Sequence, residues 1–153
     1  MSPWRRFGIV LYWLAWPALF VYLRIGERTR VAIVADGYIL LVQPWLGEAR
    51  WGLPGGGLHR GEQPAAGAVR ETLEETGVQL DPVALKPLGK YWCVQNGIGN
   101  QVHFFTVQLS GIHPVRKQFG EMADVQWVPL REVHALPLKN EVEQALALLA
   151  PKP

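Results

Sequence analysis

A glycine-rich loop that runs directly into an acidic helix is the feature of this sequence that most restricts its fold. The loop reads WGLPGGGLHRGE over residues 51–62, and a helical pattern follows from Pro64 to about Thr76. Pro64 suits the first helical position, and Gly77 suits the left-handed residue just after the last. A glycine run lets the backbone approach a ligand closely, so the loop and the helix are the first candidates for a functional site.

One face of the predicted helix carries three carboxylates. At about 100° per residue, Glu71, Glu74 and Glu75 fall on the same face. The residues expected to pack on the domain from the opposite side are Ala65, Val69, Thr72, Leu73 and Thr76. A bound divalent cation would remove the repulsion among the carboxylates, and oxygen ligands favour a hard ion such as Mg²⁺ or Mn²⁺. The alternative is a solvated acidic surface.

The loop and the helix together resemble the Nudix box, G-x5-E-x7-R-E-U-x-E-E-x-G-U, in which U is apolar. The residues that match it are Gly56, Glu62, Arg70, Glu71, Glu74, Glu75, Gly77 and Val78. Thr72 is the departure, because it stands at the first U position, where its methyl group can still pack. The likeness extends more loosely from about Arg30 to Leu149 and implies an α/β fold, the Nudix-type α/β/α sandwich with a mixed central sheet.

The resemblance also implies the catalytic residues. By position in the box, Glu71, Glu74 and Glu75 would hold the metal, and the backbone carbonyl of Gly55 is a further candidate ligand. The metal would lower the pKa of a bound water, which then attacks phosphorus. The general base differs among members of the family, so Glu75 and Glu121 are both candidates, and Glu121 could instead be an extra ligand.

Other residues are candidates for structural or substrate-binding roles. Glu62 and Arg70 would fix the loop against the helix, and Gly56 and Gly77 are structural positions of the box. Candidates for stacking on a base or steering phosphates are Trp45, Tyr91, Phe119 and Arg50. For the aromatic residues the competing interpretation is ordinary packing, and for Arg50 it is a solvated surface charge.

The rest of the chain shows strands before, between and after helices, which is typical of a layered α/β domain. Two apolar runs flank Asp36-Gly37 in RVAIVADGYILLVQP, starting at residue 30, a pattern typical of a hairpin. Further strands are expected near residues 88–94, 102–109 and 124–128. A short helix is expected to start at Pro129, and a last helix should cover residues 140–149.

An uncharged apolar run, FGIVLYWLAWPALFVYL, covers residues 7–23. As a helix it would be about 25 Å long, slightly short of a hydrocarbon core of about 30 Å. It contains Pro17 and has arginines on both sides. Packing on the domain or in a homodimer is therefore favoured over membrane anchoring. We expect residues 1–29 to form a hydrophobic helix and residues 30–153 a Nudix hydrolase domain.

Composition narrows the setting. The net charge of +2 is too weak and too scattered to indicate nucleic acid binding. Cys93, the single cysteine, excludes an internal disulfide, so a reducing cytoplasm fits best. If residues 7–23 do bind a membrane, we expect the catalytic domain on its cytoplasmic side.

These features favour a magnesium-dependent hydrolase that cleaves a phosphoanhydride bond in a nucleoside diphosphate linked to another group. The alternative is a non-catalytic regulator that binds a nucleotide or ADP-ribose in the same cleft, but such a protein would normally have lost box carboxylates. An isoprenoid diphosphate isomerase would need further catalytic segments in a longer chain. The sequence leaves the identity of the nucleotide-like substrate open.

Overall fold

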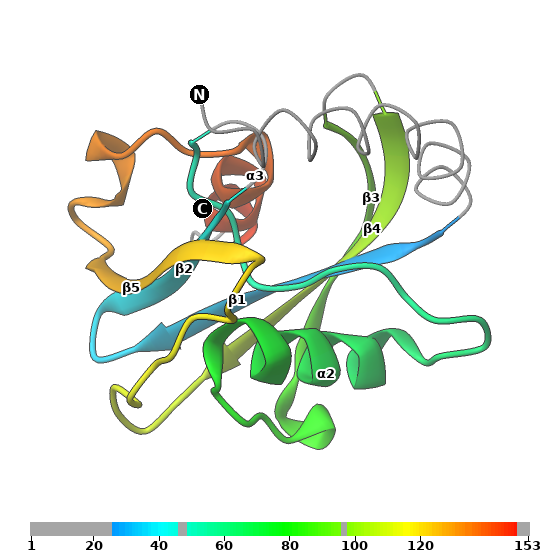
Figure 1. Cartoon of the computed structure of the whole chain (residues 1–153), viewed down its shortest axis with the longest axis horizontal. Coiled ribbons are helices and arrows are strands. Elements are labelled where there is room, and N and C mark those ends of the chain that lie inside the picture. The colour runs from blue at the N-terminus through cyan, green and yellow to red at the C-terminus, as the bar shows by residue number, and fades with distance from the viewer. Residues whose placement is uncertain (1–25, 46–48, 96–97, 150–153) are drawn as a thin grey trace, which may run out of the picture.

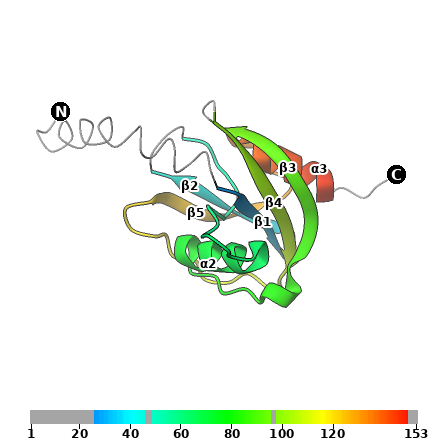
Figure 2. The same cartoon turned by 90° about the vertical axis from the view of Figure 1, so that its right-hand side faces the viewer.

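The computed structural model describes residues 26–45, 49–95 and 98–149. They form a five-stranded mixed sheet in the order β3-β4-β1-β2-β5, with one helix on each face (Figure 1, Figure 2). The strands are β1 (Arg28–Ala35), β2 (Tyr38–Pro44), β3 (Lys86–Gln95), β4 (Ile98–Gln108) and β5 (Met122–Pro129). The helices are α2 (Pro64–Thr76) and α3 (Asn140–Leu149), and short 3-10 turns cover Pro82–Ala84 (η1) and Val133–Ala135 (η2). The predicted three-layer α/β fold is confirmed, whereas the expected N-terminal helix and the run at residues 7–23 lie outside the described residues.

The first two strands form the expected hairpin. Asp36 and Gly37 have φ angles of 49° and 79°, as a two-residue turn with both residues in the left-handed region requires. β1 also runs parallel to β4, while β2 is antiparallel to β5 and β3 is antiparallel to β4. β1 therefore lies at the centre of the sheet, with its two faces covered by different helices.

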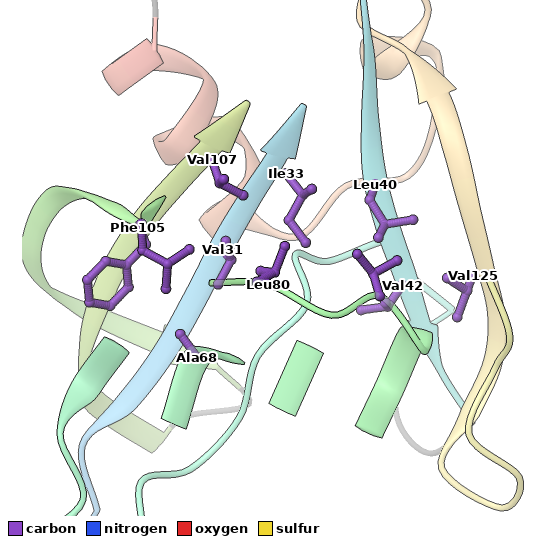
Figure 3. Close-up of a cluster of buried hydrophobic side chains, with 11 residues drawn as sticks. Val31, Ile33, Leu40, Val42, Ala68, Leu80, Phe105, Val107 and Val125 are labelled. Carbon is purple, nitrogen blue, oxygen red and sulfur yellow. The ribbon is translucent and has the colours of Figure 1, made fainter. Parts of the chain in front are cut away.

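Successive side chains along each strand point to opposite faces of the sheet, and the apolar ones form a separate core on each face. Val31 and Ile33 of β1 point toward α2 and pack with Phe105 of β4 and Ala68 of the helix (Figure 3). Ala32 and the neighbouring strands contribute to a second cluster on the other face, which includes Val142 and Ala145 of α3 and Phe104 of β4. The two helices are thus fixed on opposite sides of the strands that carry the glycine-rich loop.

The prediction of which residues of α2 are buried is wrong in part. The buried residues are Gly67, Ala68, Thr72, Glu75 and Thr76, whereas Leu73 is 38% exposed. The helix is rotated so that Glu75 points inward, where its carboxylate accepts the backbone N–H of Gly55.

Two smaller differences concern the C-terminal half and the membrane. Pro129 ends β5, where it pairs with Tyr38, instead of starting a helix, and the 3-10 turn begins at Val133. Within the described part of the chain, no helix has the length and apolar character needed to cross a membrane.

Candidate active site

The glycine-rich loop lies along β1 like an additional strand. β1 and β2 pair next to their turn, and farther from it the loop lies between them. The N–H groups of Thr29 and Val31 donate to the carbonyls of Gly56 and Pro54, each at 2.9 Å, and Gly52 pairs with β2 on the other side. The backbone of the loop is therefore held on both sides, directly in front of α2.

Gly55 and Gly56 are the two loop positions at which a side chain would collide with a neighbouring group. Gly55 has a φ of 135°, and a Cβ there would lie 2.2 Å from the carbonyl oxygen of Thr29. A Cβ on Gly56 would lie 2.3 Å from Oε2 of Glu71. The missing side chains let the loop approach β1 on one side and a box carboxylate on the other.

The ends of α2 set where the carboxylates fall. Pro64 starts the helix without a side-chain cap from Gln63. Gly77 ends it in the left-handed conformation, with φ of 74° and its N–H donated to the carbonyl of Leu73 at 2.9 Å. Glu71, Glu74 and Glu75 therefore occupy the last two turns, beside the loop.

Arg70 connects the loop to the helix. Its Nε and Nη2 each donate to Glu62 at 2.9 Å in a two-bond fork, and Nη2 also reaches the carbonyl of Gly57 at 3.0 Å. Nη1 lies 2.8 Å from Glu71 and 3.4 Å from Glu74. The hydrogen bonds from Arg70 lower the pKa of Glu62 to about 2. One guanidinium thus orients three carboxylates, because its planar donors are arranged for paired contacts.

Glu75 is the buried carboxylate of the site. Its Oε2 accepts from the N–H of Gly55 at 2.8 Å, and its residue is 7% exposed. Burial raises the pKa of Glu75 to about 7, although the Gly55 N–H and the Arg30 charge both act to lower it. In the metal-free protein, Glu75 can therefore exchange a proton near neutral pH.

A second ion pair lies behind the loop, and the sequence analysis missed it. Arg30 Nε donates to Glu141 of α3 at 2.8 Å, and both side chains are almost fully buried. Arg30 Nη1 donates to the carbonyl of Gly55 at 2.5 Å, so that carbonyl already has one partner. The signal that could have revealed Arg30 is the arginine at alternate positions, Arg28 and Arg30, in a strand that is otherwise largely apolar.

The arrangement matches a known family. The family model for the NUDIX domain matches residues 26–149. The chain belongs to the NUDIX domain family. The matched range begins just before β1 and ends with α3, so it covers the sheet, both helices and the site.

Relatives and solved NUDIX structures are similar over most of this range. An RNA pyrophosphohydrolase from Aeromonas hydrophila is 30% identical over 142 residues, covering 76% of this chain and 79% of the relative. The putative mutator protein MutT4 of Mycobacterium tuberculosis is 34% identical over 89 residues, or 57% of this chain. This second match spans about a third of the relative's length, at 36%.

Two solved structures share the fold. The MutT NUDIX hydrolase from Burkholderia pseudomallei superimposes with a TM-score of 0.72 at 24% identity, covering 82% of this chain and 98% of that one. The NUDIX domain of Shewanella oneidensis NrtR, in complex with ADP ribose, gives 0.71 at 22% identity, with 80% and 84% covered.

The segment that carries Glu121 lies beside the end of the NUDIX box helix. Glu121 is exposed in the turn before β5, and its carbonyl accepts the N–H of Trp45 at 2.8 Å. Three residues earlier, the N–H of Gln118 donates to the carbonyl of Glu75 at 3.3 Å. The structure thus brings Trp45, Phe119 and Glu121 to one side of α2, with Trp45 69% exposed and Phe119 fully exposed.

The other two substrate candidates lie elsewhere. Tyr91 is half-buried on the α3 face of the sheet, where its ring meets Phe104 edge-on at a centroid distance of 5.9 Å. Arg50 is exposed at the start of the loop. Tyr91 therefore packs on the α3 face of the sheet, whereas Phe119 lies in the exposed turn before β5.

The carboxylates of the box fit a hard cation by chemistry, although their side chains are held by protein partners. Among the described residues, no three His, Cys, Asp or Glu side chains are grouped in metal-binding geometry. Glu71 faces Arg70, and Glu75 faces the Gly55 N–H. Yet all the candidate ligand atoms are oxygens, which a hard cation prefers. Glu75 is desolvated, and because Gly56 has no Cβ, the Glu71 carboxylate can lie against the loop. These features suit a divalent ion such as Mg²⁺.

Proposed function

We propose that this NUDIX protein is a pyrophosphohydrolase that cleaves a phosphoanhydride bond in a nucleoside diphosphate linked to another group. The observation that carries the proposal is the set of contacts around Arg70, which holds the glycine loop and the box carboxylates in one constellation. The similarity to an RNA pyrophosphohydrolase supports the same class of reaction.

The proposed cofactor is Mg²⁺ or Mn²⁺. Glu71, Glu74 and Glu75 would hold it, with the carbonyl of Gly55 as an additional candidate because a carbonyl oxygen can serve Arg30 and a cation together. When bound, the ion neutralises phosphate charge and lowers the pKa of a water for attack on phosphorus.

The protein's own groups orient the reaction. Arg70 keeps Glu71 beside the loop, and the loop's backbone confines Glu75. Glu75, whose carboxylate lies against the glycine loop, is one candidate to accept the proton of the attacking water. Glu121, exposed beside the end of α2, is the other.

The test is turnover by purified full-length protein with Mg²⁺ against nucleoside triphosphates, nucleotide sugars, ADP-ribose, dinucleoside polyphosphates and a 5′-triphosphate RNA. Glu74→Gln should lower kcat by orders of magnitude without unfolding the chain, because Glu74 is about half exposed. Glu132→Gln, which removes an exposed carboxylate outside the box, is the matched control and should keep wild-type turnover. Near-native turnover of Glu74→Gln at saturating Mg²⁺ would refute the metal assignment.

A second candidate function is a regulator that binds a nucleotide or ADP-ribose without turnover. The observation that favours this second function is the structural likeness to the NUDIX domain of NrtR, which was solved in complex with ADP ribose. Binding of these ligands to the wild type, combined with no turnover on any member of the panel, would decide for it.

Residues 7–23 need a partner surface, because an apolar run of this size is too costly to leave in water. We propose that they dock on protein, either on this domain or in a homodimer, with the enzyme in the cytoplasm. Fractionation of the untagged chain in its host is the test. Recovery in the membrane pellet, resistant to salt and carbonate but released by detergent, would instead show a membrane-anchored enzyme.

A further inference from the structure

Two buried polar atoms on the α3 face of the sheet have no hydrogen-bond partner within the described part of the chain. They are Nε of Arg28, on β1, and Oδ1 of Asn100, on β4. Asn100 is only 7% exposed, so neither neighbouring side chains nor bulk water account for its carbonyl oxygen. Folded proteins pair nearly all such groups, and a pair of unmatched ones on one face suggests a ligand that supplies the partners.

The sheet places these two residues close together. In the parallel pairing of β1 and β4, Arg28 lies beside Val102, and Asn100 lies two residues before Val102 on the same strand face. From the strand spacing, the two Cα atoms are roughly 8 Å apart. On β3, Asn100 is paired with Cys93, whose Sγ lies 3.5 Å from Oε1 of Gln144 on α3. Helix α3 therefore covers the Asn100 end.

The Arg28 end faces the box. Arg28 forms a β-bridge with Gly57 of the glycine loop. Burial, together with the charge of Arg30, lowers the pKa of Arg28 to about 10, and the acidic groups that oppose this shift are Glu141, Glu71 and Glu75. Glu141 is already paired with Arg30. Arg28 thus holds a largely desolvated positive charge within electrostatic reach of Glu71 and Glu75 of the box.

Lys139 adds to the positive charge behind the loop. Burial lowers the pKa of Lys139, and its charge is felt by Glu75 as well as by Glu141. Because Glu141 offsets the charge of Arg30, Arg28 and Lys139 are the positive charges that can attract an anionic group to this end of β1. At the Asn100 end, the neighbouring Cys93 thiol feels the opposite charges of Glu141 and Arg30, which are paired with each other.

We propose that Arg28 and Asn100 orient the substrate, with Arg28 binding a phosphate oxygen and Asn100 accepting a hydrogen bond from an N–H of the nucleobase. The inference rests on the proposed function and adds the orientation of the substrate in the site. The phosphate lies at the box end of β1, and the base lies toward the β3–β4 hairpin. A guanidinium binds phosphate through charge-assisted, paired donors. An amide oxygen suits the amino or imino edge of a base.

Binding without metal tests this orientation independently of hydrolysis. The four ribonucleosides and their 5′-monophosphates are titrated calorimetrically into the full chain in EDTA. We expect the wild type to bind at least one nucleotide about tenfold or more tightly than its nucleoside, as for a charged hydrogen bond. Arg28→Gln should remove most of this phosphate advantage and leave nucleoside affinity unchanged. Asn100→Leu should weaken nucleoside and nucleotide binding by the same factor, roughly threefold to tenfold.

Two further variants guard against indirect effects. Arg131→Gln removes the same charge from an exposed side chain that pairs with Glu132, and it should keep the phosphate advantage. Arg28→Lys keeps the charge but loses the paired donors, so it should retain part of the advantage and serves if Arg28→Gln does not fold.

The inference is overturned if the wild type shows no phosphate advantage, or if Arg28→Gln and Arg131→Gln preserve it equally. A buried water that satisfies both atoms would give a lower Tm in the Arg28 and Asn100 variants with unchanged binding ratios, which also overturns it. Hydrolysis by the wild type is measured in parallel. If the wild type hydrolyses a substrate but Arg28→Gln keeps the phosphate advantage, only this orientation is rejected. If Arg28→Gln loses the phosphate advantage but the wild type hydrolyses nothing, only the enzymatic proposal is rejected.

Discussion

The backbone N–H of Gly55 donates to the buried carboxylate of Glu75 at 2.8 Å and joins the glycine-rich loop to the helix. This position requires glycine, because its φ is 135° and a Cβ would collide with the backbone of Thr29. The same bond orients Glu75 toward the sheet, so that this carboxylate loses most of its contact with water.

The burial of Glu75 predicts that the metal-free protein becomes less stable as the pH rises from about 4.5 to 7. Its pKa is raised from an ordinary 4.5 to about 7, so in this range the folded chain keeps a proton that the unfolded chain has released. Raising the pH through this range therefore lowers the free energy of unfolding, by up to roughly 3 kcal/mol. Glu75→Gln should lack this component. Urea unfolding in EDTA at pH 5 and pH 7.5 measures it, and an equal pH dependence in both proteins would contradict the assignment.

Gly56→Ala should impair catalysis, whereas Gly57→Ala should not. A Cβ at Gly56 would meet the Glu71 carboxylate at 2.3 Å, so Glu71 must move away from the loop. At Gly57, the next residue, a Cβ would meet nothing within 4 Å. We expect kcat to fall at least tenfold in the first variant, in the range found for misplaced catalytic groups, with less than a twofold change in the second. Equal kinetics in the two variants would show that the position of Glu71 is unimportant.

Elements bounded by local signals could be predicted from the sequence. Pro64 and Gly77 mark the ends of α2 through backbone geometry that they impose on their own positions. Asp36-Gly37 likewise specifies its turn. The spacing of Glu71, Glu74 and Glu75 in the chain was enough to place them in the same two turns of a helix.

Features that depend on contacts between residues far apart in the chain could not be predicted from the sequence. Helical periodicity gives the angles between Leu73 and Glu75 but not the rotation of the helix against the sheet, and that rotation buried Glu75 and exposed Leu73. Arg30 and Glu141 are 111 residues apart, so no local pattern could join them. Their pairing depends on α3 returning to the sheet beside the loop.

Arg70→Lys should destabilise the protein although it keeps the charge. A lysine cannot reproduce the two-bond fork to Glu62 together with the contacts to Glu71 and the carbonyl of Gly57. We expect a loss of about 1 to 3 kcal/mol in the free energy of unfolding, measured in urea at pH 7, together with lower turnover. Arg131→Lys is the control, because Arg131 is 83% exposed and should tolerate the change within about 0.5 kcal/mol. Equal stabilities of the two variants would contradict the role of Arg70 as the connection between loop and helix.

Thr72→Val should stabilise the protein, because Thr72 is completely buried and its Oγ1 has no hydrogen-bond partner within the described residues. Valine has nearly the same shape and restores the apolar residue that the box has at this position, so the variant removes an unsatisfied hydroxyl without opening a cavity. We expect a gain of about 1 kcal/mol and a Tm higher by a few degrees, with turnover unchanged. Thr76→Val is the matched control in the same helix. The Thr76 hydroxyl donates to the carbonyl of Thr72 at 2.7 Å and accepts from the Val78 N–H at 3.1 Å, so its loss should lower the Tm. A lower Tm for Thr72→Val as well would mean that its hydroxyl has a partner, such as a buried water, and that this departure from the box is itself stabilising.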